Sequence, residues 1–162
     1  MSGPPLGRLW AGWRSSYVET TPQIEGCVLC AVTGADAEVI WRGRTCAAVL
    51  NAYPYTSGHL MVVPARHVGE LEELTADEAS ELWATVTDAV VAIKAAYRPG
   101  GINVGANLGR DSGAGVPGHL HVHALPRWNG DTNFMTTLAE VRVLPEALPD
   151  TLAKLRAAWP SR

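Results

Sequence analysis

The sequence predicts an α+β fold, in which a five-stranded antiparallel sheet is combined with one long helix and with flanking N- and C-terminal helices. Two observations predict this class. Short apolar segments with strand-like patterns follow one another at the spacing of hairpins, and a single long helical pattern is inserted among them. The regular alternation of strand and helix that is typical of a doubly wound parallel fold does not occur in the sequence.

Five segments have the pattern of β-strands. The triplet Arg42-Gly43-Arg44 separates the first two and predicts a hairpin turn. A sheet of five strands has two open edges, so association of two copies through a strand or a helix is expected. The strands are expected at residues 38–41, 45–50, 59–64 and 101–109, and in the histidine-rich segment that follows Gly118.

The long helix has the clearest signals of its beginning and end. Thr75 at the N-cap and Glu78 three residues later form a capping box, and apolar residues then recur at helical spacing. The run Arg98-Pro99-Gly100-Gly101 is expected to stop this helix. Residues 6–18 and 148–159 also carry amphipathic patterns, which predict the helices near the two ends of the chain.

Composition limits the class of protein. The length of 162 residues fits one domain with a single core, and the net charge of −3 argues against binding to nucleic acid or to an anionic membrane. The longest apolar runs are far shorter than a membrane span. Three cysteines, two of them in a C-x-x-C, favour a reducing compartment, so the cytoplasm is the expected location.

Three of the five histidines alternate with apolar residues in the segment His119-Leu120-His121-Val122-His123. This is the period of a strand that is buried on one face and presents imidazoles on the other, roughly 6.5–7 Å apart. Each buried ring has polar atoms that need partners, so packing alone does not account for the alternation. The segment predicts a metal site, a catalytic site, or one of each.

Cys27-Val28-Leu29-Cys30, expected to be a short turn-like segment, has the spacing of half a zinc site. A tetrahedral site needs two further ligands, for which His67 and His119 are the candidates. Redox pairs and buried thiols also have the C-x-x-C spacing, so these alternatives remain open. Cys46 lies in an apolar strand and is expected to be a small core residue.

The histidines also suit phosphoryl transfer. A neutral imidazole can attack phosphorus and form a phosphoramidate, which a second nucleophile then opens. The glycine-rich residues 109–118 precede the histidines and offer backbone N–H groups for an anion, although a mobile surface connection is the alternative. The sequence contains no Walker-type lysine motif and no carboxylate cluster typical of catalytic Mg²⁺, so histidine chemistry is favoured.

The segment His119-Leu120-His121-Val122-His123-Ala124-Leu125 resembles the H-φ-H-φ-H-φ-φ motif of the histidine triad (HIT) superfamily of nucleotidyl transferases and hydrolases. Residues 50–67 resemble the ribose-binding segment and following strand of that family, and residues 103–109 resemble its next strand and phosphate loop. Residues 126–134 resemble a tail found in the bacterial branch near diadenosine tetraphosphate phosphorylases. Several independent motifs therefore agree in type and in order.

The resemblance implies roles for individual residues. His121 corresponds to the nucleophile that attacks the α-phosphate, and His123 to the last triad histidine, which contacts that phosphate and assists the leaving group. Asn51 falls where the family binds the ribose hydroxyls, and Asn107 falls where an amide reaches the phosphates. His59 matches a histidine that hydrogen-bonds near the triad and belongs to the same nucleotide-binding set.

One departure from the family concerns the loop before the triad. Many members carry Gly-Gln-Ser/Thr there, whereas this chain has Gly113-Ala114-Gly115-Val116. The side-chain donors at two positions are therefore lost, and the backbone N–H of Gly115 is expected to contact phosphate instead. The glycine-rich form also occurs in phosphorylase-like relatives, which favours dinucleoside polyphosphates over phosphoramidates as substrates.

The resemblance also implies a metal and a domain layout. One HIT-like domain is expected over residues 1–162, with a core at about 27–134, an N-terminal helical extension at 1–26 and a C-terminal helix within 135–162. No catalytic metal is implied. In zinc-containing relatives a C-x-x-C joins a later histidine and the first triad histidine, which here implies a structural zinc ion on Cys27, Cys30, His67 and His119.

The expected function is cleavage of the α-phosphate bond of a dinucleoside polyphosphate, such as diadenosine tetraphosphate, through a covalent nucleotidyl-His121 intermediate. The expected protein is a homodimeric hydrolase or phosphorylase that binds an adenine nucleotide. Three alternatives remain at this point. They are a hydrolase of nucleoside phosphoramidates or acyl-adenylates, a nucleotide-binding module without catalysis, and a protein in which all three histidines bind a transition metal.

Overall fold

The computed structural model describes residues 26–34, 38–131 and 144–161. The helix expected at 6–18 lies outside the described residues. Within them, no helix is both long and apolar enough to cross a membrane. The helical elements are α2 (Val28–Gly34), η1 (Leu71–Glu73), α3 (Ala76–Tyr97), η2 (Arg110–Ser112) and α5 (Leu148–Ala158). The strands are β1 (Val39–Arg42), β2 (Cys46–Leu50), β3 (Leu60–Pro64), β4 (Gly101–Gly105) and β5 (Val122–Arg127).

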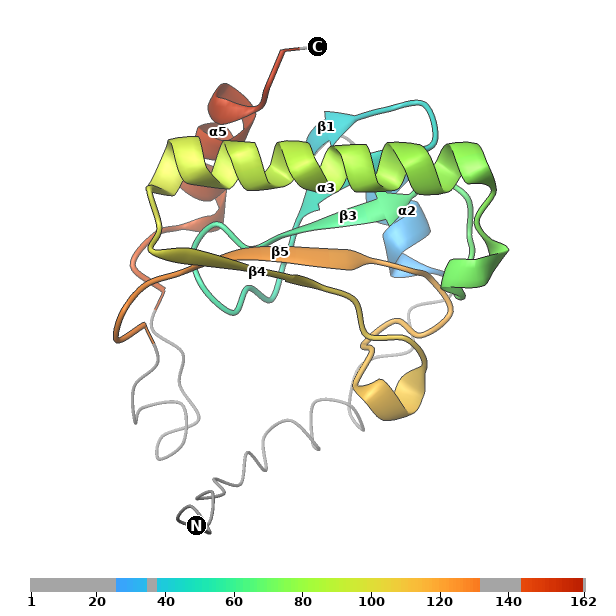
Figure 1. The fold of residues 1–162 in the computed structure, drawn as a ribbon. Helices are drawn as coiled ribbons and strands as arrows, with labels where there is room; N and C mark the ends of the chain where they lie inside the picture. Colours follow the sequence, from blue (N-terminus) through green and yellow to red (C-terminus); the bar gives the residue numbers. More distant parts are fainter. Residues whose placement is uncertain (1–25, 35–37, 132–143, 162) are drawn as a thin grey trace, which may run out of the picture.

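The five strands form one antiparallel sheet in the order β1-β2-β3-β5-β4, which confirms the predicted fold class. The long helix α3 lies across one face of this sheet, and α5 packs beside α3 near β1 (Figure 1). Since β5 lies between β3 and β4, the strand that carries His123 is an internal strand of the sheet and β4 is an edge strand.

The main core lies between the sheet and α3. Alternate strand residues such as Val62, Val122 and Ala124 point toward the helix, which contributes Leu82, Val86 and Ile93. A smaller core lies on the opposite face, where Leu29 of α2 packs against Val49 and Val63. Successive residues of a strand therefore point alternately to the core under α3 and to the smaller core on the other face of the sheet.

The signals for the long helix are confirmed. Thr75 Oγ1 accepts a hydrogen bond from the Glu78 backbone N–H, and the Glu78 carboxylate accepts one from the Thr75 backbone N–H. The helix ends at Arg98, which adopts a left-handed conformation with φ of 45°. The hairpin at residues 42–44 is also confirmed, because the Gly43 N–H bonds the Cys46 carbonyl between β1 and β2.

Three local predictions are wrong. The segment after Cys27 is a helix rather than a turn, because Leu29 and Thr33 on one side of α2 are buried and Leu29 packs against β2. The fourth strand stops at Gly105 instead of reaching Gly109, because pairing with β5 ends where Gly105 lies opposite His123. The fifth strand begins only at Val122, so two of the three histidines precede it.

Candidate active site and metal centre

The three histidines lie on the face of the sheet that is turned away from α3. Leu120 and Val122 belong to the core beneath α3. His123 lies opposite Met61 in the β3–β5 pairing, and Met61 packs with the smaller core on the other face. His119 and His121 precede β5 and are 0% and 5% exposed, so each ring needs a polar partner within the fold.

His121 is oriented by its own local backbone. Its Nδ1–H donates a 2.8 Å hydrogen bond to the His119 carbonyl oxygen. In the neutral ring this assignment leaves the Nε2 lone pair unprotonated. The arrangement suits a nucleophile, because a new bond at Nε2 makes the ring cationic and the carbonyl at Nδ1 stabilises that charge.

A directed chain of hydrogen bonds ends at His123. The Tyr55 backbone N–H, which can only donate, bonds His59 Nδ1 at 3.0 Å. Neutral His59 therefore carries its proton on Nε2, which lies 2.9 Å from His123 Nδ1. Since His123 Nδ1 accepts this bond, its own proton sits on Nε2. His123 is thereby set as a hydrogen-bond donor beside His121, whose ring centre lies 5.0 Å away.

Electrostatics favour the neutral form of His123. Burial, followed by the neighbouring His121, lowers the pKa of His123 from the ordinary 6.5 to about 4. The ring of Tyr55 covers this pair, with its centre 4.8 Å from that of His59 and 6.1 Å from that of His123. Tyr55 was not among the predicted site residues, because an aromatic residue in a loop carries no periodic signal.

Asn51 lies beside His59 and is buried. Its Oδ1 accepts a hydrogen bond from the Tyr53 N–H at 2.9 Å, and its Nδ2 lies 3.4 Å from both ring nitrogens of His59. Asn51 therefore also shapes the loop that orients His59. The structure brings Asn51 and His59 together with His123, as expected for a single site.

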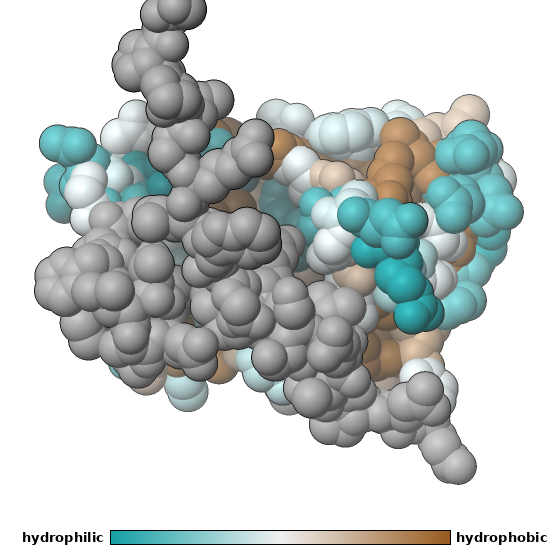
Figure 2. Space-filling view, turned by 90° about the horizontal axis from the view of Figure 1, so that it is seen from below, coloured by the Kyte–Doolittle hydropathy of each residue, from teal (hydrophilic) through white to brown (hydrophobic). Residues whose placement is uncertain are grey.

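The glycine-rich loop, residues 109–118, follows β4, whose last residue Gly105 lies opposite His123, and it ends directly before His119. Its helical turn η2 lies on the side of the sheet opposite α3 (Figure 1). Asn107 Nδ2 lies 3.4 Å from the Gly113 carbonyl, and Gly115 is exposed with open space where a Cβ would stand. Figure 2 views this side from below, where strongly hydrophilic side chains gather toward the η2 end.

The four predicted metal ligands form one cluster. Their ligand atoms all lie within 4.8 Å of one another. His119 Nδ1 lies 3.2 Å from Cys27 Sγ and 3.4 Å from Cys30 Sγ, and His67 Nδ1 lies 3.4 Å from Cys30 Sγ. A tetrahedral zinc ion would set such sulfur–nitrogen distances at about 3.6 Å. The residues therefore fit zinc in both donor type and spacing.

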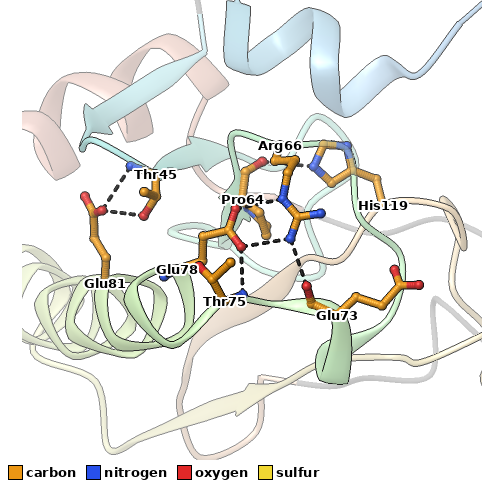
Figure 3. A network of polar contacts seen from close by, with 8 residues as sticks. All are labelled: Thr45, Pro64, Arg66, Glu73, Thr75, Glu78, Glu81 and His119. Carbon is orange, nitrogen blue, oxygen red and sulfur yellow. Dashed lines mark hydrogen bonds and ion pairs between the residues drawn. The ribbon is translucent and has the colours of Figure 1, made fainter.

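The tautomer of His119 supports this fit. Its Nε2–H donates a 2.9 Å hydrogen bond to the Pro64 carbonyl (Figure 3). This leaves the lone pair on Nδ1, the nitrogen that lies near the sulfur atoms of Cys27 and Cys30. Burial lowers the pKa of His119 against the opposing effect of the Pro64 hydrogen bond, and this favours the neutral ring that a metal ligand must have. Burial and the neighbouring Cys27 raise the pKa of Cys30, and a divalent cation would offset this cost of ionising the Cys30 thiol.

The HIT domain model matches residues 32–130 of this chain. The chain belongs to the HIT domain family. A relative from Mycobacterium tuberculosis named "AP-4-A phosphorylase" is 41% identical over 165 aligned residues, covering 95% of this chain and 85% of the relative. A Schizosaccharomyces pombe protein named "Bis(5'-nucleosyl)-tetraphosphatase [asymmetrical]" is 35% identical over 95 residues, covering 59% of this chain and 52% of that protein.

A solved HIT structure matches the fold as well as the family. It is a zinc-bound histidine triad family protein from Mycobacterium smegmatis, with a TM-score of 0.67 and 28% identity. The match covers 82% of this chain and 92% of that one. Curated HIT relatives of this chain are thus named as phosphorylase and hydrolase enzymes, and one solved relative binds zinc.

Proposed function

We propose that this HIT protein cleaves the α-phosphate bond of dinucleoside polyphosphates, with diadenosine tetraphosphate as the representative substrate. The observation that carries the proposal is the pair of opposite tautomers at His121 and His123. One ring offers a lone pair at Nε2 and the other offers an N–H, within a centre-to-centre distance of 5.0 Å. The names of the relatives from M. tuberculosis and S. pombe support this substrate class.

In the proposed first step, His121 Nε2 attacks the α-phosphorus and forms a P–N bond. The bond from that phosphorus to the bridging oxygen breaks, and the nucleoside polyphosphate leaves with its electron pair. His123 Nε2–H donates a hydrogen bond to the α-phosphate and to the leaving oxygen. In the second step, water or inorganic phosphate attacks the same phosphorus, and the P–N electron pair returns to His121.

Three further residues complete the proposed nucleotide site. Asn51 would bind a ribose hydroxyl through the remaining lone pair of Oδ1, while the Tyr53 N–H, which donates to the other, holds the amide in place. Asn107 would exchange its long contact with the Gly113 carbonyl for a phosphate oxygen. The exposed backbone at Gly115 would supply the N–H that replaces the missing hydroxyl side chain, since no side chain blocks a close approach.

The proposed zinc is structural. Cys27, Cys30, His67 and His119 would hold it, and it would supply a fixed cross-link rather than a Lewis acid for the reaction. His119 would then bind the metal through Nδ1 and orient His121 through its carbonyl oxygen. Thiolate ligands of this kind persist in a reducing compartment, which supports a cytoplasmic location.

We further propose a homodimer. The edge strand β4 and the segment after it expose Val104 and Leu108 by 42% and 43%, and α3 exposes Trp83 by 50%. Apolar side chains on an open edge and on an adjoining helix favour pairing with a second copy. Sedimentation equilibrium of the full chain tests this, since a monomer at high protein concentration would contradict it.

Product analysis with diadenosine tetraphosphate, with and without inorganic phosphate, tests the proposed reaction. Phosphate as acceptor gives ADP and ATP, whereas water gives AMP and ATP. Mass spectrometry of enzyme quenched with denaturant at alkaline pH, where the P–N bond survives, should detect a nucleotidyl adduct on the peptide that contains His121. Tight binding of the nucleotide without any product would instead support a non-catalytic binding module and would reject the proposed reaction.

A further inference from the structure

The geometry points to Arg66 as a positioning residue that couples the start of α3 to the metal-ligand cluster and, through His119, to His121. The inference rests on the proposed metal site. Arg66 contacts none of the reacting groups, and its importance follows from the segment in which it lies. That segment, residues 64–68, joins the end of β3 to the approach to η1.

Two backbone carbonyls of residues 64–68 accept hydrogen bonds from the first triad histidine, His119, and from the residue after it. The Pro64 carbonyl accepts the hydrogen bond from His119 Nε2 at 2.9 Å, and the Val68 carbonyl accepts one from the Leu120 N–H at 2.7 Å. His67 of the same segment is one of the four metal-ligating residues. A shift of this short segment would therefore move a ligand and the partner of a second ligand together.

Arg66 anchors the middle of that segment to the first turn of α3 (Figure 3). Its Nε and Nη2 each donate a 2.8 Å hydrogen bond to a separate oxygen of the Glu78 carboxylate, and Nη2 also donates to the Glu73 carbonyl at 2.9 Å. The two-pronged geometry suits arginine and not lysine. The capping box holds Glu78 in turn through the Thr75 N–H, so the anchor is itself fixed.

The exposed fractions separate this pair from an ordinary surface ion pair. The Arg66 and Glu78 side chains are 48% and 11% exposed, whereas those of Arg44 and Asp77, at the same end of α3, are 70% and 78% exposed with a 3.5 Å contact. Hydrogen bonds from Arg66, and then from the Thr75 backbone, lower the pKa of Glu78 to about 2. Arg44 is therefore a matched control, because its replacement removes the same charge near the same helix end.

Zinc affinity of the full chain, measured by competition with a chromophoric chelator, tests the inference. For Arg66→Met we expect the zinc dissociation constant to rise about tenfold or more, because residues that orient metal ligands affect affinity on this scale. Arg66→Lys should raise it about threefold, because a single ammonium does not span both acceptors. Arg44→Met should leave it within about twofold of the wild type.

Urea unfolding of the metal-free variants distinguishes positioning from general support. A lower stability of Arg66→Met with an unchanged zinc dissociation constant would overturn the inference. If Arg66→Met does not fold, Arg66→Lys decides the question, and wild-type affinity in that variant would refute it. If the wild-type protein binds no zinc, the proposed metal site itself is rejected. If the wild type and all variants bind zinc with equal affinity, the metal site stands and only the role of Arg66 is rejected.

Discussion

Replacement of His59 by glutamine and by asparagine separates the two hydrogen bonds made by this buried imidazole. The glutamine amide reaches about as far as histidine Nε2 and can donate to His123, whereas the asparagine amide reaches about as far as Nδ1. Asparagine therefore keeps an acceptor for the Tyr55 N–H, 3.0 Å from Nδ1, but loses the 2.9 Å bond to His123. The two variants are matched in polarity and differ in which partner they retain.

The magnitude follows from one hydrogen bond. A buried hydrogen bond contributes about 1 kcal/mol and more when it fixes a reacting group, and about 1.4 kcal/mol corresponds to a tenfold change in rate. For His59→Asn we expect kcat to fall roughly tenfold with a smaller change in KM, because His123 loses the partner that sets its tautomer. For His59→Gln we expect kcat within about threefold of the wild type, with a stability loss of about 1 kcal/mol because the hydrogen bond from the Tyr55 N–H to Nδ1 is lost.

Single-turnover formation of the nucleotidyl-enzyme from diadenosine tetraphosphate is the suitable assay, because it reports the step in which His123 acts. Urea unfolding of the same samples gives the stability loss independently. Equal rates in the two variants would refute the reasoning, because the hydrogen bond to His123 that only glutamine keeps would then have no effect on the rate. A wild-type rate in His59→Asn would show that the tautomer of His123 does not depend on His59.

Three other predictions address the remaining parts of the site. For His121→Ala, single-turnover transfer from diadenosine tetraphosphate should fall by at least about three orders of magnitude, and substantial residual turnover would contradict a covalent mechanism. For Cys27→Ser, elemental analysis should find the zinc lost, whereas His123→Ala should retain it; loss in both would favour a metal site made of the triad itself. The stability measured by urea should be full above pH 6.5 and should decrease toward pH 4, because the pKa of His123 is lowered from 6.5 to about 4 and the unfolded chain takes up the proton first. A second decrease should lie between pH 4.5 and pH 2, where the lowered pKa of Glu78 has the same consequence, and Glu78→Gln should reduce this second decrease without changing the first, because the pKa values of Glu81 and Glu146 are lowered as well.

The parts of the fold that were predicted correctly depend on neighbouring residues in the chain. The capping box of Thr75 and Glu78 is one example, because both partners lie within four residues of each other. Cys46 in the core is another, since its strand is apolar on both sides and the residue is 2% exposed. Helix α2 was missed because it is only 7 residues long and because Leu29 is buried by contacts with β2 and β3, which are distant in the sequence.

In the candidate site, too, some features were predicted from the sequence and others were not. The four candidate metal ligands were predicted from the C-x-x-C spacing together with the family resemblance, and the structure brings their ligand atoms within 4.8 Å of one another. The predicted strand at the histidines was wrong for His119 and His121, because pairing with β3 reaches only to Val122. Arg66 and Tyr55 carried no signal in the sequence, since each acts through a partner distant in the chain or through its backbone.

The sequence by itself placed the three imidazoles on one side of their segment and limited the candidate chemistry to metal binding, histidine catalysis or both. Alternation along residues 119–124 placed the imidazoles opposite Leu120 and Val122, and this follows from the geometry of any extended chain. The tautomer of His121 follows from a carbonyl two residues away, but only the tertiary structure decided which nitrogen carries the proton in His119 and His123. The carbonyl of Pro64 and the N–H of Tyr55 make that choice for His119 and, through His59, for His123. Such partners come from distant segments, and no local pattern of residues specifies them.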